Sequence, residues 1–313
     1  MSGAIRSIGI VGAGLVGSGW AIVFARAGLD VTIFDPDPGI RAGVRSHIGG
    51  GLEALEAVGL VNDPAAALAR IAIVESLEDA VGRADYVQES VFERVDVKAR
   101  VSAEIDACLK PGAIVGSSSS GIPASAFTET CASRANFMVV HPVNPPHLVP
   151  VVEIVPAPWT DADAVAEVHA LMERVGQVPV LVRREIEGFI LNRLQGALLN
   201  EAWALFEEGY ASAADIDKTV AHGLGLRWSF MGPFETIDLN APGGISDYAE
   251  RLGPLYHSIA RSRTEPRGWS GDLIAAAAAE RRAALAEEDL AARRDWRDAY
   301  LTRLAAFRKA QEP

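Results

Sequence analysis

A histidine and a glutamate twelve residues apart carry the strongest chemical signal in the chain. His141 directly follows the apolar run Met138–Val140 and precedes Pro142, so we expect its imidazole in a stiff segment at the carboxyl end of a buried strand. Glu153 lies inside the apolar run Val151–Val155, where an unpaired carboxylate would be costly to bury. A carboxylate partner fixes the tautomer of an imidazole and raises its basicity, so the pair is predicted to be a general base and its partner. The alternative is a structural histidine held by hydrogen bonds.

A glycine-rich turn near the start of the chain predicts a dinucleotide site. The sequence Gly12-Ala13-Gly14-Leu15-Val16-Gly17 follows a predicted strand and opens a predicted helix, and Asp35 ends the next strand, 18 residues after Gly17. Gly12 permits the tight turn, Gly14 lets the backbone approach a pyrophosphate, and Gly17 allows close packing of helix on strand. Asp35 is expected to accept hydrogen bonds from the adenine-ribose hydroxyls and to repel a 2′-phosphate. NAD is therefore favoured over NADP, and the alternative is a glycine-rich turn without a ligand.

These groups need a parallel sheet to bring them together, and the first half of the chain has the pattern of one. Short β-branched runs alternate with helix-like segments, which predicts a doubly wound, mostly parallel α/β sheet of the Rossmann type. The runs are Ile8–Val11, Val31–Phe34, Ile71–Val74, Tyr86–Val87, Ala113–Val115 and Met138–Val140. Ligands bind at the carboxyl ends of such strands, so the serine run 117–120 is expected to face the crevice, unless it is a solvated turn.

The pattern changes after the last strand-like run, Val178–Val182, and the chain becomes helical by composition. We therefore predict a Rossmann-like domain over residues 1–184 and an all-helical domain over residues 185–313. The helix that opens the second region is apolar nearly all round, so it must be buried in a core or against a second subunit. In the tail, an apolar stripe recurs at helical spacing and is expected to dock onto the protein's own body. The stripe consists of Trp296, Tyr300, Leu304 and Phe307.

Charge and composition exclude several classes of partner. The chain has 29 basic and 41 acidic side chains, a net charge of −12, which disfavours nucleic acids and anionic membranes. The charge-free stretch Ser7–Ala25 approaches the length of a membrane span but holds five glycines, and no signal-peptide pattern is present. Two distant cysteines predict no disulfide framework and suit a reducing cytoplasm. The remaining histidines show no metal-ligand spacing, so no metal site is predicted.

Six motifs in order resemble the 3-hydroxyacyl-CoA dehydrogenase family over about residues 8–240. They are Gly12–Gly17, Glu89–Glu93 with Lys98, Ser117–Ser120, His141–Pro145, Gly188–Arg193 and Met231–Glu235. Within the family, the segments His141–Pro146, Gly223–Pro233 and Ala292–Asp298 are similar to the lambda-crystallin branch, whose enzyme activity is L-gulonate 3-dehydrogenase. The resemblance implies oxidation of a 3-hydroxyl by NAD and a homodimer formed through the helical C-terminal domain.

The resemblance also assigns roles to single residues. It makes His141 the base and Glu153 its partner. It places three polar groups around the reacting oxygen, namely Ser119, Asn144 and Asn192. Glu93 and Lys98 fall where the family contacts the cofactor, whereas from their spacing alone they would form a solvated helical pair.

Departures from the family pattern indicate the substrate. Hydroxyacyl-CoA enzymes of the family offer basic residues after the second strand to hold CoA phosphates. Residues 36–97 contain no lysine here, and their only arginines are Arg41, Arg45, Arg70, Arg83 and Arg94. Arg227 instead resembles the branch's carboxylate-binding arginine, and a guanidinium fork matches a carboxylate bidentately. We therefore expect a small L-3-hydroxy acid as substrate, with L-gulonate the best guess. A short-chain L-3-hydroxyacyl-CoA ester, carnitine, and a non-enzymatic NAD-binding crystallin-like role stay open as alternatives.

Overall fold

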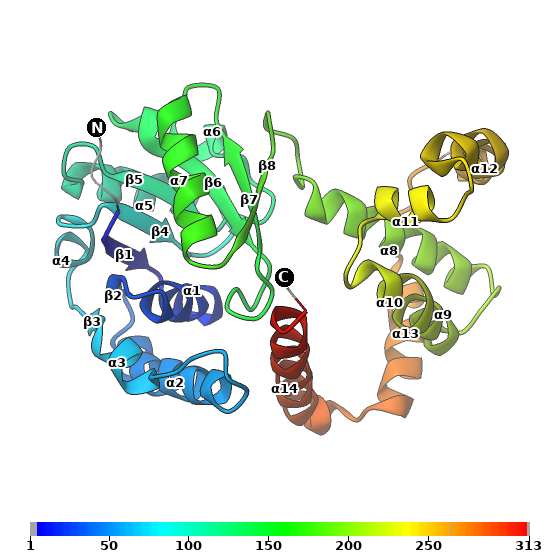
Figure 1. The fold of residues 1–313 in the computed structure, drawn as a ribbon, viewed down its shortest axis with the longest axis horizontal. Coiled ribbons are helices and arrows are strands. Elements are labelled where there is room, and N and C mark those ends of the chain that lie inside the picture. Colours follow the sequence, from blue (N-terminus) through cyan, green and yellow to red (C-terminus); the bar gives the residue numbers. More distant parts are fainter. Residues whose placement is uncertain (1–4, 264, 312–313) are drawn as a thin grey trace. The chain divides into compact units, whose positions relative to one another are not determined.

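The computed structural model describes residues 5–263 and 265–311 and divides into two compact units (Figure 1). The first unit comprises the chain up to Leu194 together with the residues from Arg293 onward, and the second comprises Gln195–Ala292. The predicted domain boundary after residue 184 stays a prediction. It falls between the last strand, which ends at Leu181, and the helix that begins at Leu191.

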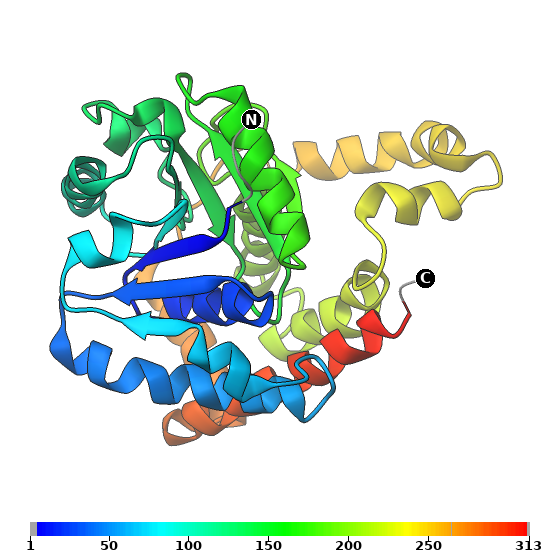
Figure 2. The same ribbon diagram turned by 60° about the vertical axis from the view of Figure 1, so that its left-hand side comes forward.

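The first unit is built on one eight-stranded sheet with the order β3-β2-β1-β4-β5-β6-β7-β8. Its strands are β1 (Ser7–Val11), β2 (Asp30–Phe34), β3 (Ile71–Ile73), β4 (Tyr86–Glu89), β5 (Ile114–Ser117), β6 (Phe137–Pro142), β7 (Val151–Pro156) and β8 (Val178–Leu181). All neighbouring strands pair in parallel except β6 and β7, which are antiparallel; Figure 2 shows β1 and β2 running the same way. The strand order reverses between β1 and β4, and a dinucleotide binds at such a switch point.

Helices cover both faces of this sheet, as the doubly wound pattern predicted. They are α1 (Leu15–Arg26), α2 (Pro38–Glu56), α3 (Pro64–Ala69), α4 (Leu77–Val81), α5 (Val95–Cys108), α6 (Ser125–Thr128), the turn η1 (Arg134–Asn136) and α7 (Ala162–Arg174). Asp37 and Asp63 cap α2 and α3 from the position before a proline, which is a favourable start for a helix. The fold class predicted from the sequence is confirmed.

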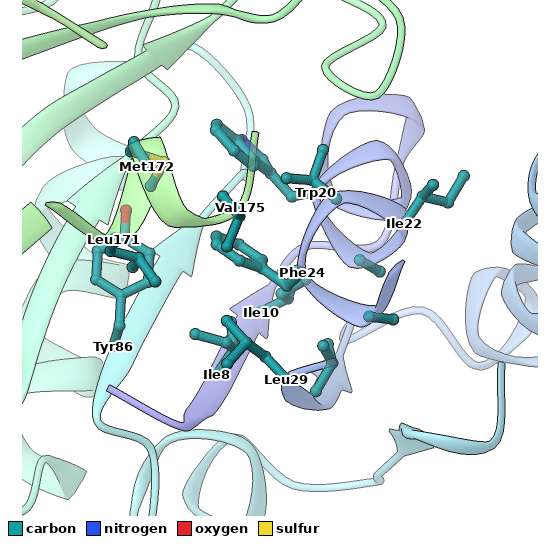
Figure 3. Packing of buried hydrophobic residues seen from close by; sticks show 14 of the residues in the cluster. Ile8, Ile10, Trp20, Ile22, Phe24, Leu29, Tyr86, Leu171, Met172 and Val175 are labelled. Atoms are coloured by element: carbon teal, nitrogen blue, oxygen red, sulfur yellow. The ribbon is translucent and has the colours of Figure 1, made fainter. Parts of the chain in front are cut away.

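The main core lies between the sheet and the helices α1, α2 and α7 (Figure 3). Trp20 and Phe24 of α1 stack with ring centroids 5.3 Å apart, and both are fully buried against the strands. A second cluster fills the opposite face under α4 and α5. Every predicted strand is present, but the run Val151–Val155 also forms a strand, β7, which the sequence had not marked as one.

The second unit is helical. Its elements are α8 (Leu191–Glu207), which begins in the first unit, α9 (Ala213–Thr219), the π-helix η2 (Val220–Leu224), α10 (Gly225–Trp228), α11 (Pro233–Leu239), α12 (Gly244–Arg261), α13 (Gly271–Ala284) and the turn η3 (Glu287–Asp289). We expected α8 to be buried on several sides, but among its residues only Ala204 is buried within the chain. A core inside this chain therefore does not cover the apolar face of α8.

The C-terminal helix α14 (Leu290–Lys309) corrects one prediction. From Arg293 onward the helix belongs to the first unit, and it packs there through Leu301 and the buried Thr302. Most of the predicted stripe does not make this contact, because Trp296, Tyr300 and Phe307 are 48%, 54% and 62% exposed, whereas Leu304 is half-buried. The stripe was recognised by periodicity, but a neighbouring face of the helix is the one that docks. No helix among the described residues combines the length and apolarity needed to cross a membrane.

Candidate active site

His141 and Glu153 form a buried pair at the carboxyl end of β6. The antiparallel register of β6 and β7 places the two residues directly opposite each other, and His141 Nδ1 lies 2.8 Å from Glu153 Oε2. The other carboxylate oxygen, Oε1, accepts hydrogen bonds from the amides of Ile190 and Leu191 at 2.7 and 3.0 Å. Burial acts to raise the pKa of Glu153, but the hydrogen bonds from His141 and the two amides outweigh it and hold the pKa below its ordinary value. Glu153 is therefore an ionised partner that leaves only Nε2 of the imidazole free.

The segment before α8 forms a wall of this pair. Gly188 and Phe189 both have positive φ values, of 74° and 50°, and Phe189 is the one described residue other than glycine with that conformation. The Phe189 side chain is fully buried, with its ring centroid 5.7 Å from that of His141. A phenylalanine in the left-handed region is strained, and surrounding contacts must hold it there. Sequence reasoning missed Phe189, because no composition signal marks a positive φ at an aromatic residue.

The glycine-rich turn has the shape that a dinucleotide requires. Gly12 has φ 96°, and a Cβ there would lie 2.5 Å from the carbonyl oxygen of Ser90, so glycine is needed at this position. A Cβ on Gly17 would collide with Gly12 O, whereas one on Gly14 would meet nothing within 4 Å. The open space beside Gly14 lies at the start of α1, whose first-turn amides no side chain caps. These residues fit the pyrophosphate of NAD.

Asp35, Leu15 and Val16 complete the turn. Asp35 is 7% exposed, and its two oxygens accept hydrogen bonds from the amides of Ala13 at 2.8 Å and Asp37 at 2.9 Å. The carboxylate therefore braces the turn itself, and each oxygen keeps a lone pair for a ribose hydroxyl. Leu15 is 67% exposed at the first position of α1, while Val16 packs on the main core.

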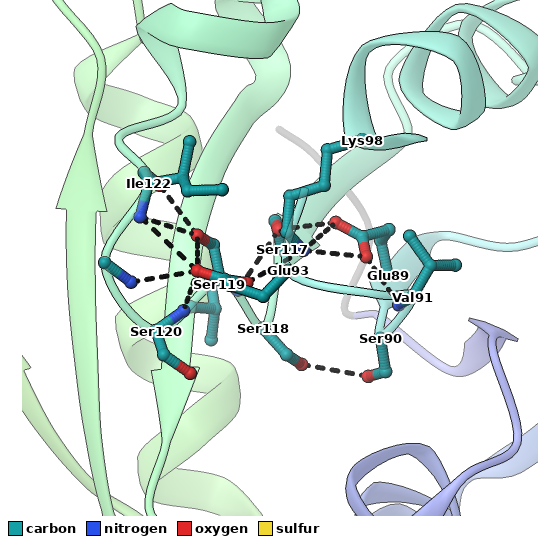
Figure 4. A network of polar contacts seen from close by, with 12 residues as sticks. Glu89, Ser90, Val91, Glu93, Lys98, Ser117, Ser118, Ser119, Ser120 and Ile122 are labelled. Atoms are coloured by element: carbon teal, nitrogen blue, oxygen red, sulfur yellow. Dashed lines mark hydrogen bonds and ion pairs between the residues drawn. The ribbon is translucent and has the colours of Figure 1, made fainter. Parts of the chain in front are cut away.

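Lys98 belongs to a buried polar network and not to a solvated helical pair (Figure 4). Its side chain and that of Glu89 are each 1% exposed, and Nζ lies 3.1 Å from Glu89 Oε1. Ser117 Oγ and the amide of Val91 also donate to the Glu89 carboxylate. Nζ is 3.5 Å from Glu93 Oε2, so the cation touches both acids. Sequence reasoning quoted Glu89 only as part of a motif and gave it no role.

Glu93 organises the loop that follows β5. Its Oε1 accepts hydrogen bonds from Ser119 Oγ and the amide of Ser120, both at 2.8 Å, and from the amide of Gly121 at 3.0 Å. Burial acts to raise the pKa of Glu93, but Lys98 and these hydrogen bonds leave it lower than usual. Ser119 was expected beside the reacting oxygen. Its side chain is instead fully buried between Glu93 and Ile122, so it shapes the loop, and Ser120 is the exposed serine.

The two predicted asparagines come from different segments of the chain, one after β6 and one at the start of α8. Asn144 is exposed in the loop after β6, three residues beyond His141. Asn192, in the first turn of α8, donates from Nδ2 to the carbonyl oxygen of Ser120 at 2.5 Å. The amide of Leu191 is hydrogen-bonded to Glu153, and the next residue, Asn192, is hydrogen-bonded to Ser120. The His–Glu pair is therefore connected to the serine loop.

Arg227 lies in α10 of the second unit and is described within that unit only. It is exposed, and among the described residues it forms no ion pair, in contrast to Arg263 and Arg267 of the same unit. The nearby Trp228, Phe230 and Phe234 are 41%, 69% and 74% exposed, so none of the three is buried within the chain. No group of three or more metal-ligating side chains is placed to hold a metal ion in the described part of the chain.

The chain is similar to several known proteins. The family model for the NAD binding domain of 3-hydroxyacyl-CoA dehydrogenase matches residues 7–186, and the model for the C-terminal domain matches residues 188–269. Lambda-crystallin from Oryctolagus cuniculus is 37% identical over 317 residues, which cover 100% of this chain and 99% of that protein. L-Carnitine dehydrogenase from Pseudomonas aeruginosa is 39% identical over 251 residues, 80% of this chain and 78% of the enzyme. A solved 5-formyl-3-hydroxy-2-methylpyridine 4-carboxylic acid 5-dehydrogenase, described as an NAD⁺-dependent dismutase, covers 98% of both chains at 28% identity with a TM-score of 0.83.

Proposed function

Because the chain belongs to the 3-hydroxyacyl-CoA dehydrogenase family and uses NAD, we propose that it oxidises the 3-hydroxyl of a small L-3-hydroxy acid, with L-gulonate the first substrate to test. The observation that carries the proposal is the buried contact of 2.8 Å between His141 Nδ1 and Glu153 Oε2. A histidine held in this way at the carboxyl end of a strand is placed to act on a ligand in the crevice.

The chemistry follows from which nitrogen is free. Glu153 holds Nδ1, so Nε2 is the atom that takes the proton from the substrate hydroxyl, and the ionised carboxylate then stabilises the imidazolium. Bound NAD supplies the hydride acceptor. The side-chain amide groups of Asn144 and Asn192 are proposed to hold the reacting oxygen. Glu93 and Lys98 are proposed to shape the cofactor side of the site.

A carboxylate substrate is supported by three observations. Arg227 is exposed and without an ion pair among the described residues, so its guanidinium is available for a ligand. Residues 36–97 contain no lysine, and four of their five arginines already form hydrogen bonds within the chain, namely Arg41, Arg45, Arg70 and Arg94. The solved relative with the TM-score of 0.83 is itself named for a carboxylic acid.

The deciding experiment is an NADH-absorbance screen of the purified protein. The panel holds L-gulonate, L-3-hydroxybutyrate, L-carnitine and 3-hydroxybutyryl-CoA at matched concentrations. We expect the highest kcat/KM for L-gulonate or L-3-hydroxybutyrate, the two free hydroxy acids without a trimethylammonium group. A preference for the CoA ester would contradict the substrate class and would leave the dehydrogenase chemistry intact.

Carnitine is the second candidate, on the strength of one feature. Trp228, Phe230 and Phe234 expose their rings close in sequence to Arg227, and a trimethylammonium group binds aromatic faces. The carnitine dehydrogenase from Pseudomonas aeruginosa matches across this region. Turnover of L-carnitine above that of both free hydroxy acids would establish this candidate.

Replacing Arg227 with methionine is expected to raise KM for the hydroxy acid by about tenfold or more and to change kcat less, because a charge-assisted pair is lost from binding. Arg227→Lys should recover only part of the affinity, since an ammonium lacks the bidentate fork. Arg251→Met is the matched control, because Arg251 is an exposed arginine of the same unit already paired with Asp247 at 2.7 Å. An unchanged KM in Arg227→Met would show that the carboxylate is held elsewhere.

We also propose that a second copy of the chain covers the second unit. Large apolar side chains there are exposed on most helices, including Leu226 at 63%, Leu239 at 67% and Leu255 at 54%. Among the described apolar residues of that unit only Ala204 is buried, and a monomer rarely leaves so much apolar surface in water. A second copy carries the same surface, which suits a self-complementary interface.

Light scattering coupled to gel filtration should give twice the mass of one chain. The double variant Leu255→Asp with Ile259→Asp, on one face of α12, should shift the protein toward the single-chain mass. Ile40→Asp, at an exposed position of α2 in the first unit, is the control and should not. A single-chain mass for the unaltered protein at all concentrations would contradict the dimer.

We propose a cytoplasmic location, supported by the state of the cysteines. Cys108 and Cys131 are both free thiols. Burial, with the charge of Asp106, raises the pKa of Cys131 to about 11, so this thiol is not activated for exchange. Free thiols suit a reducing compartment.

A further inference from the structure

Ser90 lies at the point where the sheet offers its dinucleotide crevice. It directly follows β4, as Gly12 directly follows β1, and these two strands flank the reversal of strand order. The Ser90 amide donates to Val11 O at 2.7 Å, and the Ser90 carbonyl is the group that a Cβ on Gly12 would strike. Ser90 is half-buried, so its side chain is at the edge of the site and still accessible.

A buried chain of hydrogen bonds determines which way the Ser90 hydroxyl points. Gln88 Nε2 lies 3.3 Å from the carbonyl oxygen of Val140, which can only accept, so the amide nitrogen faces Val140 and Oε1 faces Tyr86. The same nitrogen donates to Ser118 Oγ at 2.8 Å, and Trp20 Nε1, which can only donate, approaches that oxygen at 3.2 Å.

Ser118 Oγ therefore accepts two hydrogen bonds and has its own proton left to give. Its remaining partner is Ser90 Oγ, at 2.9 Å, so Ser118 donates and Ser90 accepts (Figure 4). The proton of the Ser90 hydroxyl has no acceptor among the described residues. Tyr86, Trp20 and Gln88 are fully buried, so the groups that set the direction of the Ser118 hydroxyl are fixed in the core.

We propose that Ser90 Oγ donates a hydrogen bond to an oxygen of bound NAD. The dinucleotide offers only acceptors at its pyrophosphate and further acceptors at its ribose and carboxamide oxygens, so a serine with its proton fixed outward matches it. A hydrogen-bond chain in which each donor is itself polarised strengthens the terminal donor. The inference rests on the NAD site and not on the identity of the hydroxy acid.

The test measures the Kd for NADH by fluorescence titration, in the absence of any substrate, together with the Tm of each variant. Ser90→Ala is expected to raise Kd by about fivefold or more, the effect of losing one hydrogen bond. Ser90→Thr keeps a hydroxyl and should stay within about twofold of the unaltered protein. Ser133→Ala is the matched control, since Ser133 is a half-buried serine before the amino end of β6 and should leave Kd unchanged.

Two outcomes would overturn the proposal. If Ser90→Ala kept its Kd, with or without a lower Tm, the hydroxyl would have only a structural role. If Ser90→Ala and Ser90→Thr weakened binding equally, the shape of the residue and not its proton would matter. Neither result depends on which substrate is oxidised, so a failed hydroxy-acid assay and a failed Ser90 test are distinguishable.

Discussion

Replacing His141 with alanine is expected to lower kcat by about 10²–10⁴-fold, the usual contribution of a general base. NADH binding should persist, because the contacts of His141 among the described residues do not reach the glycine-rich turn, where we propose that the cofactor binds. The measurement is the steady-state rate with the best substrate of the panel, with the Kd for NADH determined in parallel. The loss should appear in kcat and kcat/KM together, since the proton transfer belongs to the transition state.

A second histidine provides the matched control. His169 also faces a glutamate, Glu173, at 3.6 Å, but this pair is exposed on the surface of α7. His169→Ala should therefore keep full activity. Near-normal turnover in His141→Ala with NADH still bound would remove His141 from the mechanism.

Replacing Glu89 with glutamine is expected to destabilise the protein by about 3–5 kcal/mol, because it leaves the buried ammonium of Lys98 without its main counter-charge. Glu89 and Lys98 are each 1% exposed, so water cannot replace the lost partner. Urea denaturation followed by circular dichroism gives the free energy of unfolding. The substitution lowers the free energy of unfolding, and we expect the loop that Glu93 orders to become more mobile as well.

Removing both charges distinguishes the cost of an unpaired buried charge from the cost of a lost contact. The double variant Glu89→Leu with Lys98→Met should recover much of the stability lost in Glu89→Gln, since an apolar pair of similar volume removes both of the charges that are 1% exposed. Asp96→Asn, which breaks the exposed pair with Arg94, should cause no measurable change. A loss of less than about 1 kcal/mol in Glu89→Gln would show that the buried pair is dispensable.

Much of the first unit could be predicted because its signals are local. A β-branched run such as Ile8–Val11 predicts a strand by composition, and the spacing of Gly12, Gly14 and Gly17 predicts the turn that follows it. The contact between His141 and Glu153 was also predictable, since a carboxylate in an apolar run needs a partner. That β7 runs antiparallel to β6, and so places the two residues in register, was not marked by any local pattern.

Local patterns could not show which way a side chain faces. From its spacing alone Lys98 would form a solvated pair, but Glu89 and Ser117 come from two strands and meet it in the interior. Ser119 and Ser120 are identical as residues, and only the position of Glu93 turns one inward. The docked face of α14 likewise depends on the surface that it meets, which periodicity cannot show.

The two oxygens of the Glu153 carboxylate contact different parts of the protein. One orients the imidazole, and the other satisfies the amides of Ile190 and Leu191, which would be unpaired at the start of α8. The proposed partner of the base is therefore also the side chain that caps the start of α8. Under the proposed mechanism, turnover and folding both depend on this one side chain, so a replacement at position 153 has to meet both demands at once.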